Sequence, residues 1–96
     1  MIQPKYIAKI KDEVHAFDPE GKNRYFIFGS SVRKDRFHDI DLGVVGTKSD
    51  DKKIYDLKDR LYESDIPYIV DVVDFDEARR SFTDYVFKNE PIVWLN

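Results

Sequence analysis

The chain has 96 residues, of which 42% are hydrophobic and 36% are charged, and its formal net charge is −3. A chain of this length can bury one core, so we expect a single domain over residues 1–96. The acidic balance argues against a broad nucleic-acid-binding face, and a long nucleic acid is not an expected partner. The absence of cysteine excludes disulfides and thiolate metal sites. No segment predicts a signal peptide or a membrane span, so we expect a cytoplasmic protein without a membrane partner.

The N-terminal part of the chain predicts a helix over residues 4–17 and a strand over residues 24–28. Apolar residues recur every three or four positions in the first segment, which places them on one stripe of a helix: Ile7, Ile10, Val14 and Phe17. The turn residues at 18–21 end this helix. The strand that follows is apolar on both faces, which is typical of a central strand covered on at least one side.

A glycine-serine pair then interrupts the apolar run, and a second strand is predicted over residues 39–45. Gly29 allows the backbone to turn and to approach a ligand closely, because it has no Cβ. Ser30 can cap the next turn and leave N–H groups for an anion. Successive strand residues point to opposite faces. We therefore expect one face to belong to the core, with Ile40, Leu42 and Val44. The opposite face is expected to be open and carries Asp39, Asp41 and Gly43, with the glycine leaving room near the carboxylates.

The remaining predicted elements alternate between helix and strand. A helix is predicted over residues 50–63 and a strand rich in β-branched residues over 67–75. A last helix is predicted over residues 76–89, and a short edge strand over 91–95. The predicted fold class is α/β (α+β), with a mixed sheet of about four strands, helices packed mainly on one face, and a site on the other.

Two details of these helices are also predicted. Ser49 or Asp50 could cap the helix over residues 50–63. The last helix has apolar residues at successive turns, and we expect these to be buried: Ala78, Phe82 and Val86.

The candidate catalytic residues are aspartates on the strands predicted over residues 39–45 and 67–75. Asp39 and Asp41 leave the same strand face, where two negative charges repel each other unless a cation lies between them. The alternative is a turn residue and a surface aspartate on an edge strand. Asp74 could form a capping box with Glu77 at the start of the last helix. Asp71 lies between β-branched residues and is costly to bury unless it is paired, bound to a cation or facing a cleft, so we predict Asp71 as the third carboxylate.

The glycine-serine turn supplies the candidate phosphate-binding groups. Backbone N–H groups and a hydroxyl at this turn suit a triphosphate, although an ordinary strand-to-helix turn is the alternative. Cationic side chains that follow the turn could neutralise phosphates or be solvated charges. The predicted nucleotide-binding residues are Gly29, Ser30, Ser31 as an accessory, and Arg33, with Lys34 and Arg36 nearby.

This combination resembles the signature of the nucleotidyltransferase superfamily that includes DNA polymerase β. It is most similar to the minimal nucleotidyltransferases (MNT proteins), which are often antitoxins beside HEPN partners. The pattern is Gly-Ser, roughly ten residues, Asp-x-Asp and a later acidic residue, so the connection from Gly29-Ser30 to Asp39-Ile40-Asp41 is about two residues short. Lys34 stands where such proteins often have glycine.

The resemblance implies the nucleotidyltransferase fold and a Mg²⁺-dependent transfer. Asp39, Asp41 and Asp71 would hold two Mg²⁺ ions, which Mn²⁺ could replace. The donor would be ATP or another NTP, and AMP would pass to a hydroxyl of a protein, such as a tyrosine of a HEPN toxin that assembles with the chain. Two alternatives stay open: a non-catalytic antitoxin or binding module with a vestigial site, and a metal-dependent phosphohydrolase.

Overall fold

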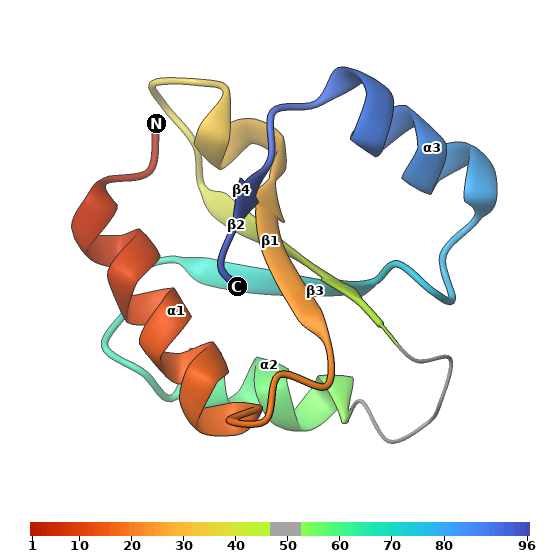
Figure 1. The fold of residues 1–96 in the computed structure, drawn as a ribbon. Coiled ribbons are helices and arrows are strands. Elements are labelled where there is room, and N and C mark those ends of the chain that lie inside the picture. The colour runs from red at the N-terminus through yellow and green to blue at the C-terminus, as the bar shows by residue number, and fades with distance from the viewer. Residues whose placement is uncertain (47–52) are drawn as a thin grey trace.

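The protein is described here by a computed structural model, which covers residues 1–46 and 53–96. Its sheet and helices follow the predicted order, with a short 3₁₀ helix (η1) after the first strand (Figure 1). The elements are α1 (Pro4–Phe17), β1 (Arg24–Phe28), η1 (Gly29–Val32), β2 (Asp39–Val45), α2 (Ile54–Tyr62), β3 (Ile69–Asp74), α3 (Arg80–Asn89) and β4 (Val93–Trp94). The predicted α+β fold with a four-stranded mixed sheet is confirmed.

The sheet has the strand order β3-β2-β1-β4. β1 pairs antiparallel with both β2 and β4, so its predicted central position is confirmed. β2 and β3 run parallel, which requires a crossover connection, and α2 lies in that connection. The predicted strands over residues 67–75 and 91–95 are shorter in the structure, at Ile69–Asp74 and Val93–Trp94.

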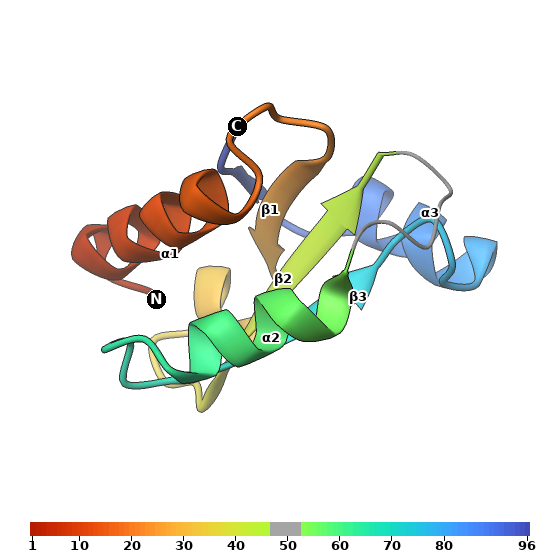
Figure 2. The same ribbon diagram turned by 90° about the horizontal axis from the view of Figure 1, so that it is seen from below.

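α1 and α2 lie on one side of the sheet, and α3 lies on the other (Figures 1 and 2). The side under α1 and α2 holds the larger core, because alternate residues of each strand point into it. The predicted core face of β2 is confirmed, since its three apolar side chains are buried there. The central members of this core are Ile10, Val14, Tyr25, Ile27, Ile40, Leu42, Val44, Leu57, Leu61, Val70 and Val72.

The side under α3 holds a smaller cluster of aromatic residues. Phe26 is fully buried and contacts Phe75 edge-on, with 4.7 Å between the ring centroids. A Cβ at Gly43 would collide with the ring of Phe26. The prediction that Gly43 leaves room near the carboxylates is therefore wrong, because the Phe26 ring fills that space. Val86 of α3 is buried as predicted, but Phe82 is 41% exposed and lies at the edge of the cluster.

The last helix begins at Arg80, four residues later than predicted. The predicted capping box of Asp74 and Glu77 does not form. Instead, an Asp74 side-chain oxygen accepts the N–H of Asp76, and the Asp74 carbonyl accepts the N–H of Glu77 and of Ala78. These bonds close a separate turn directly after β3, and the chain becomes extended again before α3 starts.

α2 begins at Ile54, after a residue in the left-handed conformation, Lys53 (φ 51°). The predicted caps Ser49 and Asp50 lie outside the described residues. The apolar spacing of this segment predicts burial of Ile54, Leu57 and Leu61. Leu57 and Leu61 are buried against the sheet, and Ile54 is partly buried against the same core. In the part of the chain that the structure covers, no helix is long and apolar enough to cross a bilayer.

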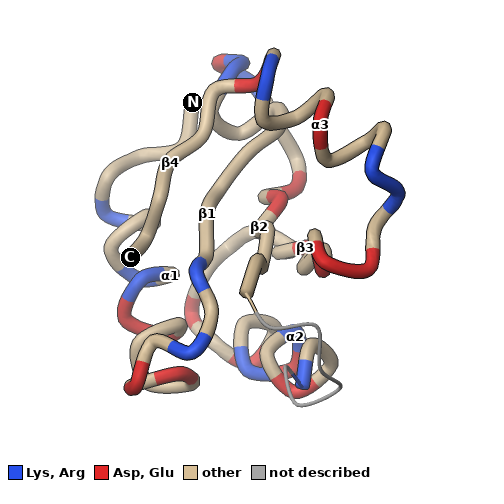
Figure 3. Tube along the Cα trace, turned by 45° about the vertical axis from the view of Figure 1, so that its right-hand side comes forward, with Lys and Arg blue, Asp and Glu red and all other residues tan. Residues whose placement is uncertain are grey.

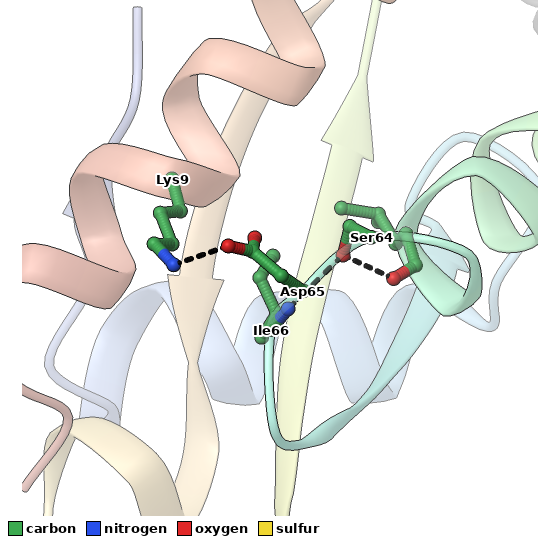
Figure 4. Close-up of polar contacts among 5 residues, drawn as sticks. Lys9, Ser64, Asp65 and Ile66 are labelled. Carbon is green, nitrogen blue, oxygen red and sulfur yellow. Dashed lines mark hydrogen bonds and ion pairs between the residues drawn. The ribbon is translucent and has the colours of Figure 1, made fainter.

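An ion pair connects α1 to the loop before β3 (Figure 4). Lys9 Nζ lies 2.7 Å from Asp65 Oδ2, and both side chains are substantially exposed. In the same loop, the Ser64 hydroxyl donates to the Leu61 carbonyl and accepts the N–H of Ile66. Exposed ion pairs contribute little free energy, so these contacts fix the path of the loop more than they stabilise the fold.

Asp18 organises the turn between α1 and β1. Its carboxylate accepts the backbone N–H groups of Lys22 and Asn23 and the hydroxyl of Tyr25, each at 3.0 Å. Burial alone would raise the pKa of Asp18, but these donors outweigh burial and hold the pKa below its ordinary value. The ionised form of Asp18 therefore stabilises the folded state.

We expect the free energy of unfolding to fall as the pH is lowered from about 4, because a carboxyl with a lowered pKa stabilises the fold only while it is ionised. The contribution is fully present above the unfolded pKa and is lost as the pH passes down through the folded pKa. Urea unfolding between neutral and acidic pH checks this. In Asp18→Asn, the free energy of unfolding should fall less steeply at acidic pH than in wild type. Asp12→Asn, which removes an equal charge from an exposed position on α1, should not change this slope. The same dependence of the free energy of unfolding on acidic pH in Asp18→Asn and in wild type would contradict the stabilising role of the Asp18 carboxylate.

Candidate active site

The carboxylates predicted on β2 and β3 lie on the sheet face that α3 partly covers. Asp39 and Asp41 alternate with buried residues of β2, so they share the face opposite the larger core. In the parallel ladder, Asp41 pairs directly with Asp71, and on its other side it pairs with Phe28. Figure 3 shows acidic positions on both strands in red. The ladder thus brings the three predicted aspartates together.

Gly29 lies against the side chain of Asp41. Its φ is 81°, a conformation that favours glycine, and a Cβ at this position would collide with the Asp41 carboxylate. The glycine-serine turn therefore touches the carboxylate face, as a site joining phosphates to carboxylates requires. The close approach that Gly29 makes in the structure is to Asp41.

Asp41 stands in unfavourable electrostatic surroundings. Burial raises its pKa, and the negative charges of Asp71 and Asp39 raise it further. Arg33 opposes this shift, and Glu90 adds to it. Among the described residues, the negative charge on this face exceeds what Arg33 offsets, which favours binding of a cation.

The structure separates the two candidates for the third carboxylate. Asp71 is exposed on the same face as Asp41. Asp74 is three residues further along β3, so its side chain leaves the opposite face, and it forms the turn with Asp76 described above. Of the two, Asp71 lies with the other aspartates.

The four predicted phosphate-binding residues differ in their access to ligand. Ser30 is partly exposed, and its carbonyl accepts the N–H of Arg33 and of Lys34. Ser31 is fully buried, and its hydroxyl has no hydrogen-bond partner among the described residues. This burial argues against the predicted accessory contact from Ser31, whose hydroxyl does not reach the surface. Arg33 is 46% exposed and lies at the end of η1.

Sequence reasoning missed one charged residue of the site. Glu90 follows α3, and its side chain is 13% exposed, with Oε1 3.7 Å from Nη1 of Arg33. It acts on Asp41 from an element that is distant in the sequence. A glutamate between a helix and Pro91 gives no signal of a site, because only the packing of α3 on the sheet brings it there.

The aspartates suit Mg²⁺ by their chemistry. Carboxylate oxygens are hard donors, which Mg²⁺ prefers. A divalent cation would also offset the negative charge of the aspartates and so reduce their mutual repulsion. Within residues 1–46 and 53–96, no three acidic or histidine side chains converge closely enough to enclose an ion. Mg²⁺ is usually held by one or two carboxylates together with phosphate oxygens and water. The donor set therefore fits an ion that is shared with a phosphate ligand.

Two hollows of the molecule lie away from this face. Their volumes are about 370 and 580 Å³, and both are lined by residues of the α1–β1 turn, Asp18 and Glu20 among them. Neither is lined by any of the predicted site residues. Charged residues and residues of the turn line both hollows. We therefore place the candidate active site on the open carboxylate face.

We expect Asp41→Asn to stabilise the fold at neutral pH by roughly 0.5 kcal/mol, the size of a like-charge contact on a sheet. Because the folded pKa of Asp41 is raised, the penalty of its charge is absent below the unfolded pKa and grows as the pH rises through the folded pKa. Urea unfolding of Asp41→Asn measures the difference, with Asp12→Asn as the matched control, since it removes an equal charge from an exposed position on α1. A loss of stability confined to Asp41→Asn would contradict the repulsion described here.

Comparison with known proteins identifies a family for the chain. The model of the family described as polymerase beta, nucleotidyltransferase matches residues 19–96, which include all the site residues named above. No curated protein is similar enough to the chain to count as a relative. The match extends over more than half of the chain and supports a nucleotidyltransferase-type function. The chain belongs to the polymerase beta nucleotidyltransferase family.

Proposed function

We propose that this protein is a Mg²⁺-dependent nucleotidyltransferase of the minimal (MNT) type, which transfers a nucleoside monophosphate from an NTP to a hydroxyl group of a protein. The observation that carries the proposal is the contact of Gly29 with Asp41, beside Asp71. A phosphate group at the turn would meet carboxylates that need a cation. The family match supports the same chemistry.

The turn supplies the groups that would hold the triphosphate. The first turn of any helix leaves backbone N–H groups without an intrahelical partner, and Gly29 and Ser30 begin η1. The partly exposed Ser30 hydroxyl and the Arg33 guanidinium add donors beside them. A guanidinium presents a fork of N–H groups that matches phosphate oxygens.

Asp39, Asp41 and Asp71 would hold one or two Mg²⁺ ions, for which Mn²⁺ could substitute. Such ions neutralise the charge that develops on phosphate oxygens and on the leaving group during transfer. The contribution of the chain is to gather hard oxygen donors on a rigid sheet, where the ladder fixes Asp41 opposite Asp71.

The transfer itself needs a nucleophile and a proton acceptor. The acceptor hydroxyl oxygen would form a bond to the α-phosphorus, while the bond from that phosphorus to the bridging oxygen breaks and pyrophosphate leaves. Asp71 is exposed, so its carboxylate is accessible to take the proton of the hydroxyl. The sum of the step is NTP plus hydroxyl giving a nucleotidylated oxygen and pyrophosphate.

We propose ATP as the donor and a HEPN-domain toxin as the acceptor, for which the chain would be the antitoxin. The resemblance to MNT proteins suggests both. An acidic chain with a net charge of −3 is poorly suited to a long nucleic acid acceptor. Ile69 is 60% exposed and pairs with Asp39, so the carboxylate face includes apolar surface of the kind that a protein can cover.

Magnesium and ATP together should raise the melting temperature of the wild-type protein, because a ligand that binds only the folded state stabilises it. Asp39→Asn and Asp41→Asn should each lose the metal-dependent part of the rise. Thermal unfolding with ATP in the presence and absence of Mg²⁺ provides the measurement. The same rise in both variants as in wild type would rule out the assigned metal ligands.

AMP should appear on a hydroxyl of the partner when the chain, ATP, Mg²⁺ and a HEPN-domain protein encoded beside it are mixed. We expect negligible turnover by the chain alone, because the proposed site is open and its residues would hold only the phosphates and the metal, not the acceptor. Mass spectrometry of the mixed proteins detects the adduct. Asp71→Asn should slow transfer by at least about 10²-fold, as expected for loss of a general base.

Asp74→Asn is the matched control for this experiment, since it removes the same charge from the other face of the sheet and should leave transfer largely intact. Three outcomes would count against the proposal. Release of AMP to water would indicate a phosphohydrolase. An unmodified partner that is neutralised equally by wild type and by Asp39→Asn/Asp41→Asn would indicate a binding module. Loss of transfer in Asp74→Asn alone would show that the wrong aspartate was chosen.

A further inference from the structure

Glu90 is a partly buried carboxylate beside the site that the proposed transfer does not use. It is the C-cap residue of α3, and its side chain is 13% exposed. Its ion-pair partner is Arg33, with 3.7 Å between Glu90 Oε1 and Arg33 Nη1. The pair therefore connects the end of α3 to the end of η1, directly beside the carboxylate face.

Several features make this an unfavourable place for a negative charge. The C-terminus of a helix carries partial negative charge, which makes the C-cap position of α3 unfavourable for a carboxylate. Glu90 also lies near enough to Asp41 to disfavour the charge there. Among the described residues, Arg33 offsets these costs, at a distance longer than a hydrogen bond. A glutamine has the same shape and would avoid these electrostatic costs. A residue that is electrostatically unfavourable beside a site is a candidate for a functional role.

Glu90 would have two effects on an anion that approaches this face. It adds a negative charge to those of the three aspartates, and it forms an ion pair with the Arg33 guanidinium. Repulsion scales with the charge of the ligand, so it acts most strongly on a triphosphate without metal. A divalent cation cancels part of the charge on both the ligand and the face, and this weakens the repulsion.

We propose that Glu90 is a specificity-determining residue: by holding Arg33 and adding negative charge beside Asp41, it restricts the face to triphosphate that is complexed with a divalent cation. This inference rests on the proposed function, because it takes the ligand to be a nucleoside triphosphate. Glu90 acts through Arg33 and through the charge of the site, and it does not take part in the transfer.

The test compares the affinity for ATP with Mg²⁺ against the affinity for ATP with EDTA, both by isothermal titration calorimetry. Wild type should bind the metal complex at least about tenfold more tightly. In Glu90→Gln, binding of metal-free ATP should strengthen more than binding of the complex, so the ratio should narrow by about fivefold. The matched control is Asp84→Asn, which removes an equal charge from an exposed i,i+4 pair with Arg80 on α3 and should leave the ratio unchanged.

Each outcome separates the inference from the proposed function. An unchanged ratio in Glu90→Gln, with normal binding by wild type, overturns the inference and leaves the proposed function standing. Equal narrowing in Asp84→Asn assigns the effect to net charge and also overturns it. Failure of wild type to bind ATP with Mg²⁺ removes the proposed function, and the inference with it.

Wild type alone can still overturn the inference if Glu90→Gln does not fold. Salt screens repulsion between an anion and a face of net negative charge, so the affinity for metal-free ATP should rise as potassium chloride is added. A basic phosphate site shows the opposite, because salt competes with the anion for its cations. A fall in this affinity with added salt would overturn the inference.

Discussion

The parallel pairing of β2 with β3 is the constraint on which the site depends. It places Asp41 opposite Asp71, and the antiparallel pairing with β1 brings Gly29 against the same carboxylate. A slip of one residue between the two parallel strands would turn every side chain of β3 to the other face, and would send Asp71 into the core. The apolar residues beside Asp71, Val70 and Val72, resist this slip because they are buried under the helices. The larger core thus holds the register that the carboxylates need.

The two sides of the sheet therefore have different roles: one carries the larger core, and the other carries the candidate site. The side under α1 and α2 is continuous and apolar, and its burial supplies most of the favourable free energy of folding. The other side is divided along β2, where Gly43 lies under the aromatic cluster and Asp41, two residues earlier, lies at the carboxylates. α3 completes the aromatic part and, through Glu90, also reaches the charged part. α3 therefore contributes both to the packing of the aromatic cluster and to the charge of the site.

Much of this arrangement follows from the period of the sequence. Alternation along β2 separates core residues from aspartates, so the face of Asp39 and Asp41 could be predicted, and the apolar surroundings of Asp71 distinguished it from Asp74. The start of α3 could not be predicted, because the Asp74 side chain bonds to the N–H of Asp76 and closes a turn of its own. Local side-chain bonds of this kind compete with a helix without disturbing its apolar spacing. Glu90 was missed for another reason, since its surroundings arise from segments far apart in the chain.

The contact of Phe26 with Gly43 has a consequence for how this fold can vary. The ring rests on the bare backbone of the neighbouring strand, so the two positions form one packing unit across the β1–β2 ladder. Any larger residue at position 43 needs a smaller one at position 26, and the exchange would open a gap under Phe75, which contacts the same ring. Descendants of this sequence would therefore be expected to change positions 26 and 43 together. The size of the aromatic cluster beside the carboxylates therefore depends on the residues at positions 26 and 43 together.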